Sequence, residues 1–562
     1  MAAEHTAAEH RARDTAFVAT CQWSTWRARL PLRWPMPPGT PASPKTHYRS
    51  QYRYLGWDDL DQPAAWAHLS EFDLVLRFVD FTGLQPVLAF LLGWASARGY
   101  IPFDPVSIFL LLGWQITHHW TRAQTLRNLA DPRYADYARR FGFRDGLYPT
   151  EGALRYYLTA LGLGSDGDTL IVDPEHQTFA TLQRLNALIA QSVTMIHDAG
   201  LLSEDAWQHA LICPDGMIHR AASRMDCTSV TDTCYQPSTP DKPRPCPARD
   251  KGREGCSCDT PACARLCRHA PARDPQARCV YYSGSNAPGP HPNRLVAEPA
   301  RPPRGKLFYG YRSLPLQLSD AARRFSLVLF DDVQPANAYE PIPIAAHLLQ
   351  LSTVYPTLHV DAVAGDANFG HDLILHIVYD HVRARRVIDL RAHETDSDKT
   401  QWPLRGYNDK GRPVCPFGYN FTANGFETDR LRHKWFCGQA CLHDTQPVVQ
   451  VPHVTYPPPE CAYQSPAHPH GEIRNIAERF ADQSLRLVRD LPVGTPAWKE
   501  LYHRGRNAVE SRNATLEGWG LKRMPVFDLP RVKATLFQAD VWLNLTTLAR
   551  LVREATTAPP VT

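Results

Sequence analysis

Three acidic residues in this sequence have the surroundings that metal-dependent chemistry requires. Asp215 directly follows the apolar segment HALICP, and Asp366 directly follows LHVDAVAG. Acids that follow strands lie at the mouths of sites in mixed sheets. Glu510 lies four residues after Arg506, on one face of an expected terminal helix. Converging carboxylates without a histidine base suit Mg²⁺, although each acid taken alone also fits a turn or a helix cap.

Cysteines form the second set of candidates, because 12 of the 14 fall in two stretches. The first stretch, at about 227–305, contains eight cysteines and no hydrophobic periodicity, so it cannot fold around an apolar core. Tetrahedral zinc could supply the missing folding energy. The alternative is a flexible insertion with reduced, unpaired cysteines. The candidate zinc ligands are Cys256, Cys258, Cys263 and Cys267.

The second stretch contains four cysteines, Cys415, Cys437, Cys441 and Cys461. Four ligands with a short spacing between the middle two match a single structural zinc site. The alternative is that some of them are small hydrophobic residues. The sequence contains no H-E-x-x-H motif, so we do not expect catalytic zinc.

The apolar pattern predicts the elements that must position these side chains. Three- and four-residue spacing predicts helices from about 57 to 163, one of them starting at Pro149-Thr150-Glu151, and another helix over 174–199. Five strand-length apolar segments follow, in the order strand, strand, strand, helix, strand, helix, strand. This order predicts a mixed α/β domain. The region after 498 is again helical in pattern.

Length and composition set the domain plan. With 562 residues and 43% hydrophobic residues the chain is neither fibrous nor fully disordered, and a net charge of +4 does not by itself indicate a polyanionic partner. We expect a poorly ordered leader at 1–50, a helical unit at 51–205, an α/β domain at 206–555 interrupted by insertions at 227–305 and 392–497, and a tail at 556–562.

The chain start is acidic and contains histidines, so it does not resemble a secretory signal. The most apolar region, 84–114, is interrupted by Arg98, Pro102, Asp104 and Pro105, which leaves runs too short to cross a bilayer. We therefore expect a cytoplasmic protein with no membrane association, in which clustered cysteines are metal ligands rather than disulfides.

Five motifs carry a family resemblance. They are FYGYR at 308–312, PANAYE at 335–340, GDANFG at 365–370, GRPVCPFGYNFTANGF at 411–426 and YHRGRNAVESRN at 502–513. The order of these motifs, together with Asp215 before them and the helical pattern of the N-terminal unit, resembles the DDE transposases of bacterial insertion sequences over roughly 80–550. The chain departs from that pattern at two positions: Tyr502 lies one residue farther from Arg506 than in the common Y-x-x-R spacing, and Glu517 stands where the family often has a lysine, with Lys522 the nearest substitute. The eight-cysteine insertion is also unusual, and it leaves Asp226 as a rival of Asp215 for the first acid.

The resemblance implies an RNase H-like catalytic core, with a mixed five-stranded sheet and flanking helices. It implies that Asp215, Asp366 and Glu510 hold Mg²⁺ or Mn²⁺ for two-metal phosphoryl transfer. It also implies a homodimer that acts on double-stranded DNA at transposon ends and targets, near the bacterial nucleoid. The helical unit at 51–205 would then bind DNA or dimerise. The alternative is an inactive or domesticated, zinc-stabilised DNA-binding descendant. The expected phosphate contacts are Arg504, Arg506, Arg512, Lys522 and Arg523.

Overall fold

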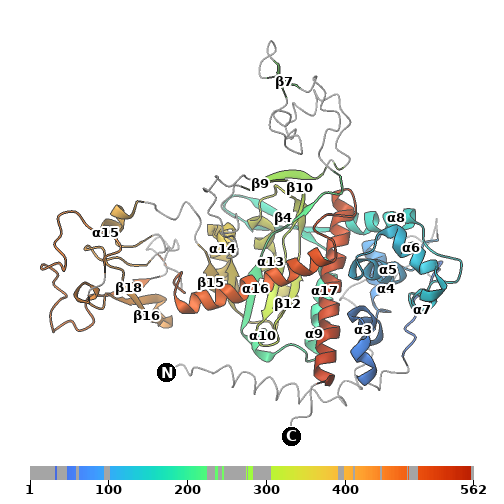
Figure 1. Cartoon of the computed structure of the whole chain (residues 1–562), viewed down its shortest axis with the longest axis horizontal. Coiled ribbons are helices and arrows are strands. Elements are labelled where there is room, and N and C mark those ends of the chain that lie inside the picture. Colours follow the sequence, from blue (N-terminus) through green and yellow to red (C-terminus); the bar gives the residue numbers. More distant parts are fainter. Residues whose placement is uncertain are drawn as a thin grey trace, which may run out of the picture.

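A computed structural model describes most of the chain (Figure 1). Most of the leader, Asp226 and the four candidate zinc ligands at 256–267 lie outside the described residues. The described residues are 32–33, 47–57, 63–93, 101–223, 235–237, 243–245, 274, 276–282, 306–389, 398–408, 412–443, 446–477, 479 and 491–557.

The centre of the molecule is a mixed five-stranded sheet. β5 and β12 are apolar and buried along their whole length, as expected for strands covered on both faces. The spatial order is β12-β11-β5-β14-β15; β11 is antiparallel to both neighbours, and β14 is parallel to both of its own. The predicted mixed α/β order is confirmed. The strands are β5 (Ala210–Pro214), β11 (Leu316–Asp320), β12 (Phe325–Phe330), β14 (Val360–Gly365) and β15 (Arg385–Ile388).

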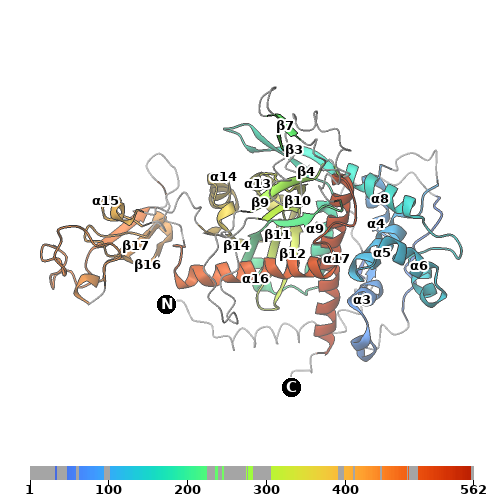
Figure 2. The ribbon, with the colours of Figure 1, turned by 45° about the horizontal axis from the view of Figure 1, so that its top comes forward.

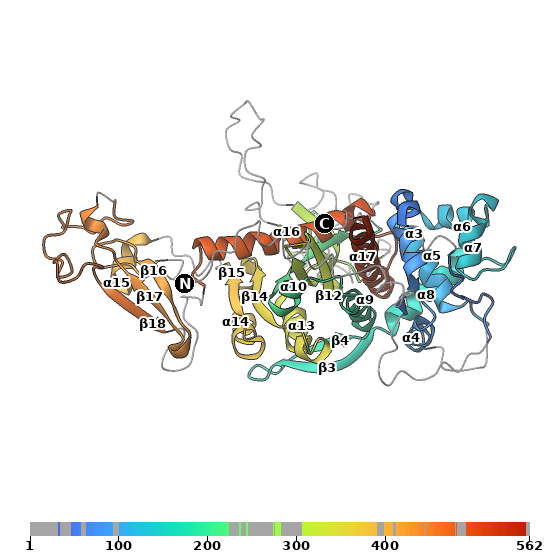
Figure 3. The same ribbon diagram turned by 90° about the horizontal axis from the view of Figure 1, so that it is seen from below.

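Alternate side chains of the central strands face opposite layers, because the strand period is two residues. Leu211, Cys213, Ala362 and Ala364 form a small cluster with the long helix α16 (Pro496–Gly518). The intervening residues join the main core, which also contains helix α13 (Pro341–Val354). Helix α14 (Asp372–His376) continues as a π-helical turn at Ile377–Val382 before β15. Figure 3 shows α16 running along one side of the sheet.

A second, antiparallel sheet adjoins the first. It has the order β13-β10-β6, with β9 also paired to β10. The segment KLFYGYRSLPLQL, expected as one strand-length run, is divided between β10 and β11 in different sheets. Pro315 lies at the break and has no backbone N–H to donate to a continuing ladder. The strands are β6 (Met217–Arg220), β9 (Arg278–Tyr282), β10 (Lys306–Ser313) and β13 (Val333–Pro335).

The helices before the sheet share a core with it through the last helix, α17 (Leu529–Thr557). Trp542 of α17 stacks on Phe109, and its indole fills the space beside Gly113 of α5. Figures 1 and 2 show α17 between the N-terminal helices and the sheet. These helices are α3 (Glu71–Phe78), α4 (Leu84–Leu91), α5 (Pro105–Thr117), α6 (Arg122–Ala130), α7 (Ala135–Arg140) and α8 (Glu151–Leu163).

The predicted helix start at Pro149-Thr150-Glu151 is confirmed, since Thr150 caps α8 by accepting from the backbone N–H of Ala153. The helix expected over 174–199 is only partly present. A hairpin of β3 (Asp166–Asp173) and β4 (Thr178–Gln183) precedes α9 (Asn186–Asp198). Asp173 accepts from the N–H groups of Glu175 and His176, and this side-chain turn reverses the chain where we expected helix.

The second insertion forms a small unit of its own beyond the start of α16 (Figures 1 and 3). Its three strands, β16 (Thr422–Glu427), β17 (Arg432–Phe436) and β18 (Ile473–Ala477), are antiparallel. Its apolar clusters contain only two or three buried residues each. The remaining short elements are β1 (Leu32–Arg33), β2 (Val79–Asp80), α10 (Glu204–Gln208), β7 (Tyr235–Pro237), β8 (Pro243–Pro245) and α15 (Trp402–Arg405).

No helix in the described part of the chain is long and apolar enough to cross a membrane.

Candidate functional site

Three acids end three neighbouring parallel strands. The ladder pairs Ile212 of β5 with Val363 of β14, and Gly365 of β14 with Ile388 of β15. Continuing these registers places Asp215, Asp366 and Asp389 side by side at one edge of the sheet. Asp389, which sequence reasoning missed, follows the strand RRVI in the same way that the two predicted acids follow theirs.

The charges of neighbouring side chains shift the pKa of Asp366. Burial raises its pKa above the usual range, and the carboxylates of Asp215 and Asp389 raise it further. The backbone N–H of Asn368, which donates to Oδ1 at 2.9 Å, and the guanidinium of Arg506 act in the opposite direction. A group of acids held this close gains from a nearby cation.

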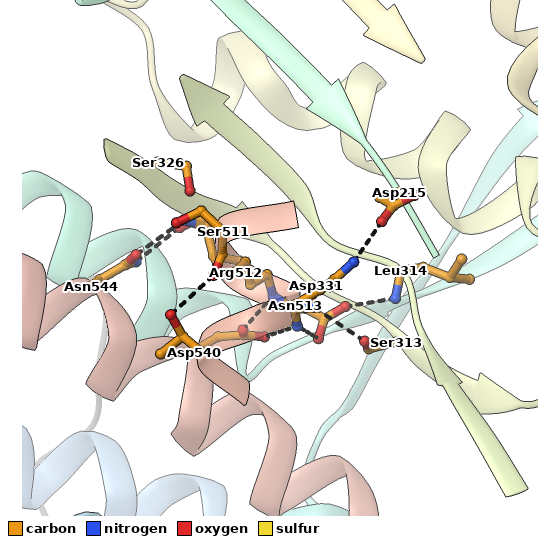
Figure 4. Close-up of polar contacts among 12 residues, drawn as sticks. Asp215, Ser313, Leu314, Ser326, Asp331, Ser511, Arg512, Asn513, Asp540 and Asn544 are labelled. Atoms are coloured by element: carbon orange, nitrogen blue, oxygen red, sulfur yellow. Dashed lines mark hydrogen bonds and ion pairs between the residues drawn. The ribbon is translucent and has the colours of Figure 1, made fainter. Parts of the chain in front are cut away.

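Asp215 is the most enclosed of the three acids, with 9% of its side chain exposed. Both carboxylate oxygens have partners on α16: Arg506 Nη1 lies 3.3 Å from Oδ1, and Asn513 Nδ2 donates to Oδ2 at 2.9 Å. Figure 4 shows Asn513 reaching Asp215 from the helix. The first predicted acid and the C-terminal motif are therefore in direct contact.

Arg506 joins the acids of the sheet to the acid of the helix. Its Nη2 lies 3.9 Å from Oε1 of Glu510, one helical turn away. Burial alone would lower the pKa of Arg506, but the carboxylates of Asp215 and Asp366 outweigh it and raise that pKa. Glu510 is 66% exposed, so its carboxylate stands at the open side of the site.

Two further charged residues, Arg312 and Glu340, border the site. Both lie in the family motifs, but the sequence did not predict a role for either. Arg312 of β10 is paired with Glu340, which directly precedes α13. A Cβ on Gly216 would lie 2.9 Å from Glu340 Oε2, so this carboxylate reaches the backbone next to Asp215. Burial raises the pKa of Glu340 to about 7; Arg312 lowers it, whereas Asp366 and Asp215 raise it. In the sequence, the only sign of these two residues is that Arg312 ends the motif FYGYR and Glu340 ends the motif PANAYE.

Helix α16 approaches the sheet closely where it passes the acids. A Cβ on Gly505 would lie 2.8 Å from both Ala364 Cβ and Cys213 Sγ, so only glycine fits without a shift. Trp498 and Tyr502 stack on each other nearby, with ring centroids 4.5 Å apart. Burial raises the pKa of Tyr502, and the neighbouring acids, Asp389 first, raise it further.

Arg512, expected to contact DNA phosphates, is enclosed in the protein. Its Nε and Nη2 donate to Asp540 at 2.8 and 2.9 Å, and Nη2 also donates to Asp331 at 3.2 Å. All three side chains are 0% exposed. The guanidinium is therefore not available to a phosphate; it fastens α16 to α17 and to the end of β12, as Figure 4 shows. Burial, followed by the Asp540 carboxylate, raises the pKa of Asp331 well above its usual range.

The other expected phosphate contacts lie in different settings. Lys522 and Arg523 are exposed in the loop after α16, where the backbone of Lys522 accepts from Arg220 of β6. Arg504 is half-buried. In the helical unit, the basic residues Arg133, Arg139 and Arg140 each pair with an aspartate, which offsets their positive charge.

The second cysteine set is brought together in the small unit. Cys415, Cys437, Cys441 and Cys461 are reduced and half-buried. Among the described residues, however, no three histidine, cysteine or carboxylate side chains are close enough together to hold a metal ion as they stand.

The oxygen donors at the strand ends have the chemistry that Mg²⁺ prefers, and the acid-on-acid repulsion at Asp366 is what a bound cation would relieve.

We compared the chain with models of protein families, with curated proteins and with solved structures. None of the three comparisons finds a match.

Proposed function

We propose that the chain is a DNA transposase of the DDE type, which cleaves and joins DNA strands by metal-dependent phosphoryl transfer. One observation carries the proposal: residues far apart in the sequence meet at one sheet edge, where α16 brings Arg506 and Asn513 against Asp215, and Glu510 lies one helical turn from Arg506. The strand order supports an RNase H-like core, because that fold has three antiparallel strands followed by two parallel ones.

The roles of the chain's own residues follow from their positions. Asp215 and Asp366 are fixed at strand ends and would hold Mg²⁺ or Mn²⁺ together with Glu510, whose exposed carboxylate can turn toward them. Bound metal would activate the attacking oxygen and stabilise the leaving oxygen. Arg506 would bind the scissile phosphate through its planar fork. Burial and the neighbouring acids raise the pKa of Glu340, which favours its neutral form and so limits the negative charge around the strand ends.

Exposed basic residues support DNA as the proposed substrate. Lys522 and Arg523 extend the positive charge beyond the C-terminal end of α16, which suits the backbone of a duplex that passes the acids. We include homodimerisation and bacterial nucleoid localisation in the proposal on the family resemblance alone.

A second candidate function is a catalytically inactive, transposase-derived DNA-binding protein. Its support is the Arg506–Asp215 ion pair, which satisfies the first acid without metal, together with Glu517 in place of a lysine. Both candidates bind DNA, so only cleavage separates them.

A plasmid assay tests the proposal. The full-length chain is incubated with a supercoiled plasmid carrying its own gene with the native flanking DNA, and in parallel with the empty plasmid, each with Mg²⁺ or with EDTA. We expect nicked and linear products with Mg²⁺, formed faster on the plasmid with the flanking DNA. Binding of that plasmid without Mg²⁺-dependent or Mn²⁺-dependent cleavage would overturn the proposal and favour the inactive DNA-binding protein.

A further inference from the structure

The four cysteines of the second insertion lie in a unit that lacks an adequate apolar core. Between Trp402 and Ala477 the buried apolar clusters are Trp402, Val414 and Val449 in one place and Phe421 with Trp435 in another. Much of the chain between these residues is turn and irregular structure around a three-stranded sheet. Units of this size and content usually depend on disulfides or a metal for stability.

The four cysteines lie on loops that pack against one another. Cys415 and Cys437 pack against the same cluster, Phe421 with Trp435. Gln464, three residues after Cys461, donates from Nε2 to Cys441 Sγ at 3.1 Å, and the backbone N–H of Cys437 donates to the carbonyl of Glu472 at 2.9 Å. The loop that carries Cys461 therefore lies against the loop that carries Cys437 and Cys441. No disulfide joins them. Packing as small hydrophobic residues explains the positions of Cys415 and Cys437 but not those of Cys441 and Cys461.

Three of the sulfurs already accept hydrogen bonds from N–H groups. Tyr419 N lies 3.4 Å from Cys415 Sγ, Glu472 N lies 3.1 Å from Cys437 Sγ, and Gln464 Nε2 lies 3.1 Å from Cys441 Sγ. A neutral thiol is a weak acceptor, whereas a metal-bound thiolate is held and tuned by such donors. The surrounding loops therefore present the donors that a thiolate site needs.

We propose that Cys415, Cys437, Cys441 and Cys461 bind one structural Zn²⁺ that holds the second insertion together. Four thiolates satisfy the tetrahedral preference of zinc and leave no open position for catalysis. Because no three of these sulfurs are yet grouped tightly enough to hold a metal, binding must draw the loops that carry Cys441 and Cys461 inward. Zinc should therefore protect this unit, and not the five-stranded sheet, against proteolysis. The inference does not depend on the proposed DNA chemistry.

Elemental analysis of the full-length chain tests the site by comparing the zinc content of variants with that of the wild type. A comparison is needed because cysteines outside the described residues could also bind zinc. We expect Cys441→Ser and Cys461→Ser each to lose one equivalent of zinc per chain relative to the wild type. Cys213→Ala, which removes a buried thiol on β5, should lose none. A Cys441→Ser protein with the wild-type zinc content would overturn the site, as would a wild-type protein without zinc.

A second variant guards against loss of zinc through misfolding. Cys441→His replaces the sulfur ligand with a nitrogen ligand that zinc also accepts, so it should retain the equivalent of zinc that Cys441→Ser loses. Limited proteolysis gives an independent readout: cleavage between 398 and 479 should become faster on chelation and slow again when Zn²⁺ is returned. Equal zinc loss in the serine and histidine variants, or cleavage unaffected by chelation, would contradict the proposal.

Discussion

The guanidinium of Arg506 lies 3.3 Å from the carboxylate of Asp215, although 291 residues separate them in the chain. This ion pair connects helix α16 to the end of β5, the central strand of the five-stranded sheet. It also sets the charge on the acids around it, since Arg506 lowers the pKa of Asp366 while Asp215 raises it.

Replacing Arg506 should therefore shift the pH dependence of the site. In Arg506→Gln the acids lose their cation, and we expect the acidic limb of the Mg²⁺-dependent cleavage profile to move to higher pH, because Arg506 lowers the pKa of Asp366. Lys499→Gln, an exposed change near the start of the same helix, is the control. A profile of Arg506→Gln with the wild-type acidic limb would show that Arg506 does not govern the ionisation of these acids.

Glu340 should make stability depend on pH in a specific window. Burial raises its pKa to about 7 from a usual value near 4.5, so the folded state binds a proton that the unfolded state has released. Its contribution is fully present below about pH 4.5 and is lost as the pH rises through about 7. The other titrating groups contribute equally to the wild type and to Glu340→Gln, so their effects cancel when the two are compared. Across that pH window the free energy of unfolding of the wild type should therefore fall by up to about 3 kcal/mol relative to that of the variant.

Urea unfolding at a series of pH values measures this difference. Glu517→Gln, an exposed change on α16, should follow the wild type at every pH. If the unfolding free energies of the wild type and of Glu340→Gln stay parallel from pH 4.5 to pH 7, the pKa of Glu340 is not raised in the folded protein.

Arg512 should be worth far more to stability than an exposed arginine. Arg512→Leu leaves Asp331 and Asp540 buried without their cation, which typically costs about 3–5 kcal/mol. Arg139→Leu breaks only an exposed pair with Asp136 and should change the unfolding free energy little. Similar unfolding midpoints for the two variants would contradict the network that we describe.

Two glycines of the same helix should respond oppositely to alanine. Gly505→Ala inserts a methyl group within 2.8 Å of β5 and β14 side chains, so the protein should lose about 1–3 kcal/mol and α16 should shift away from the acids. Gly518→Ala meets nothing within 4 Å and should be neutral or stabilising, because alanine favours helix. Thermal unfolding of both variants decides this, and a Gly505→Ala protein as stable as Gly518→Ala would argue against the close approach.

The sequence alone predicts the parts of this protein that follow periodicity. The order of strands and helices across 206–389 and the cap at Thr150 are local signals, and both are present in the structure. The hairpin before α9 was missed because the side-chain turn at Asp173 interrupts an otherwise helical pattern. The break at Pro315 was missed because both halves of the segment have strand-like patterns.

The site was harder to predict, because it depends on which segments meet. Asp389 has the same strand-end context as Asp366, but its place in the row depends on the parallel pairing of β14 with β15. Arg512 and Arg506 are six residues apart in one basic helix, yet one is enclosed by two aspartates and the other faces the acids. Charge patterns in the sequence do not separate those two environments.

Cleavage of the flanked plasmid by single acid variants tests the central claim most directly. Asp215→Asn, Asp366→Asn and Glu510→Gln should each lower the Mg²⁺-dependent rate by at least about 100-fold. Asp361→Asn is the matched control: Asp361 lies on β14, five residues before Asp366, but its side chain pairs with Arg385, and the variant should cleave like the wild type. If Asp366→Asn cleaves as fast as Asp361→Asn, the acids at the strand ends are not the catalytic site.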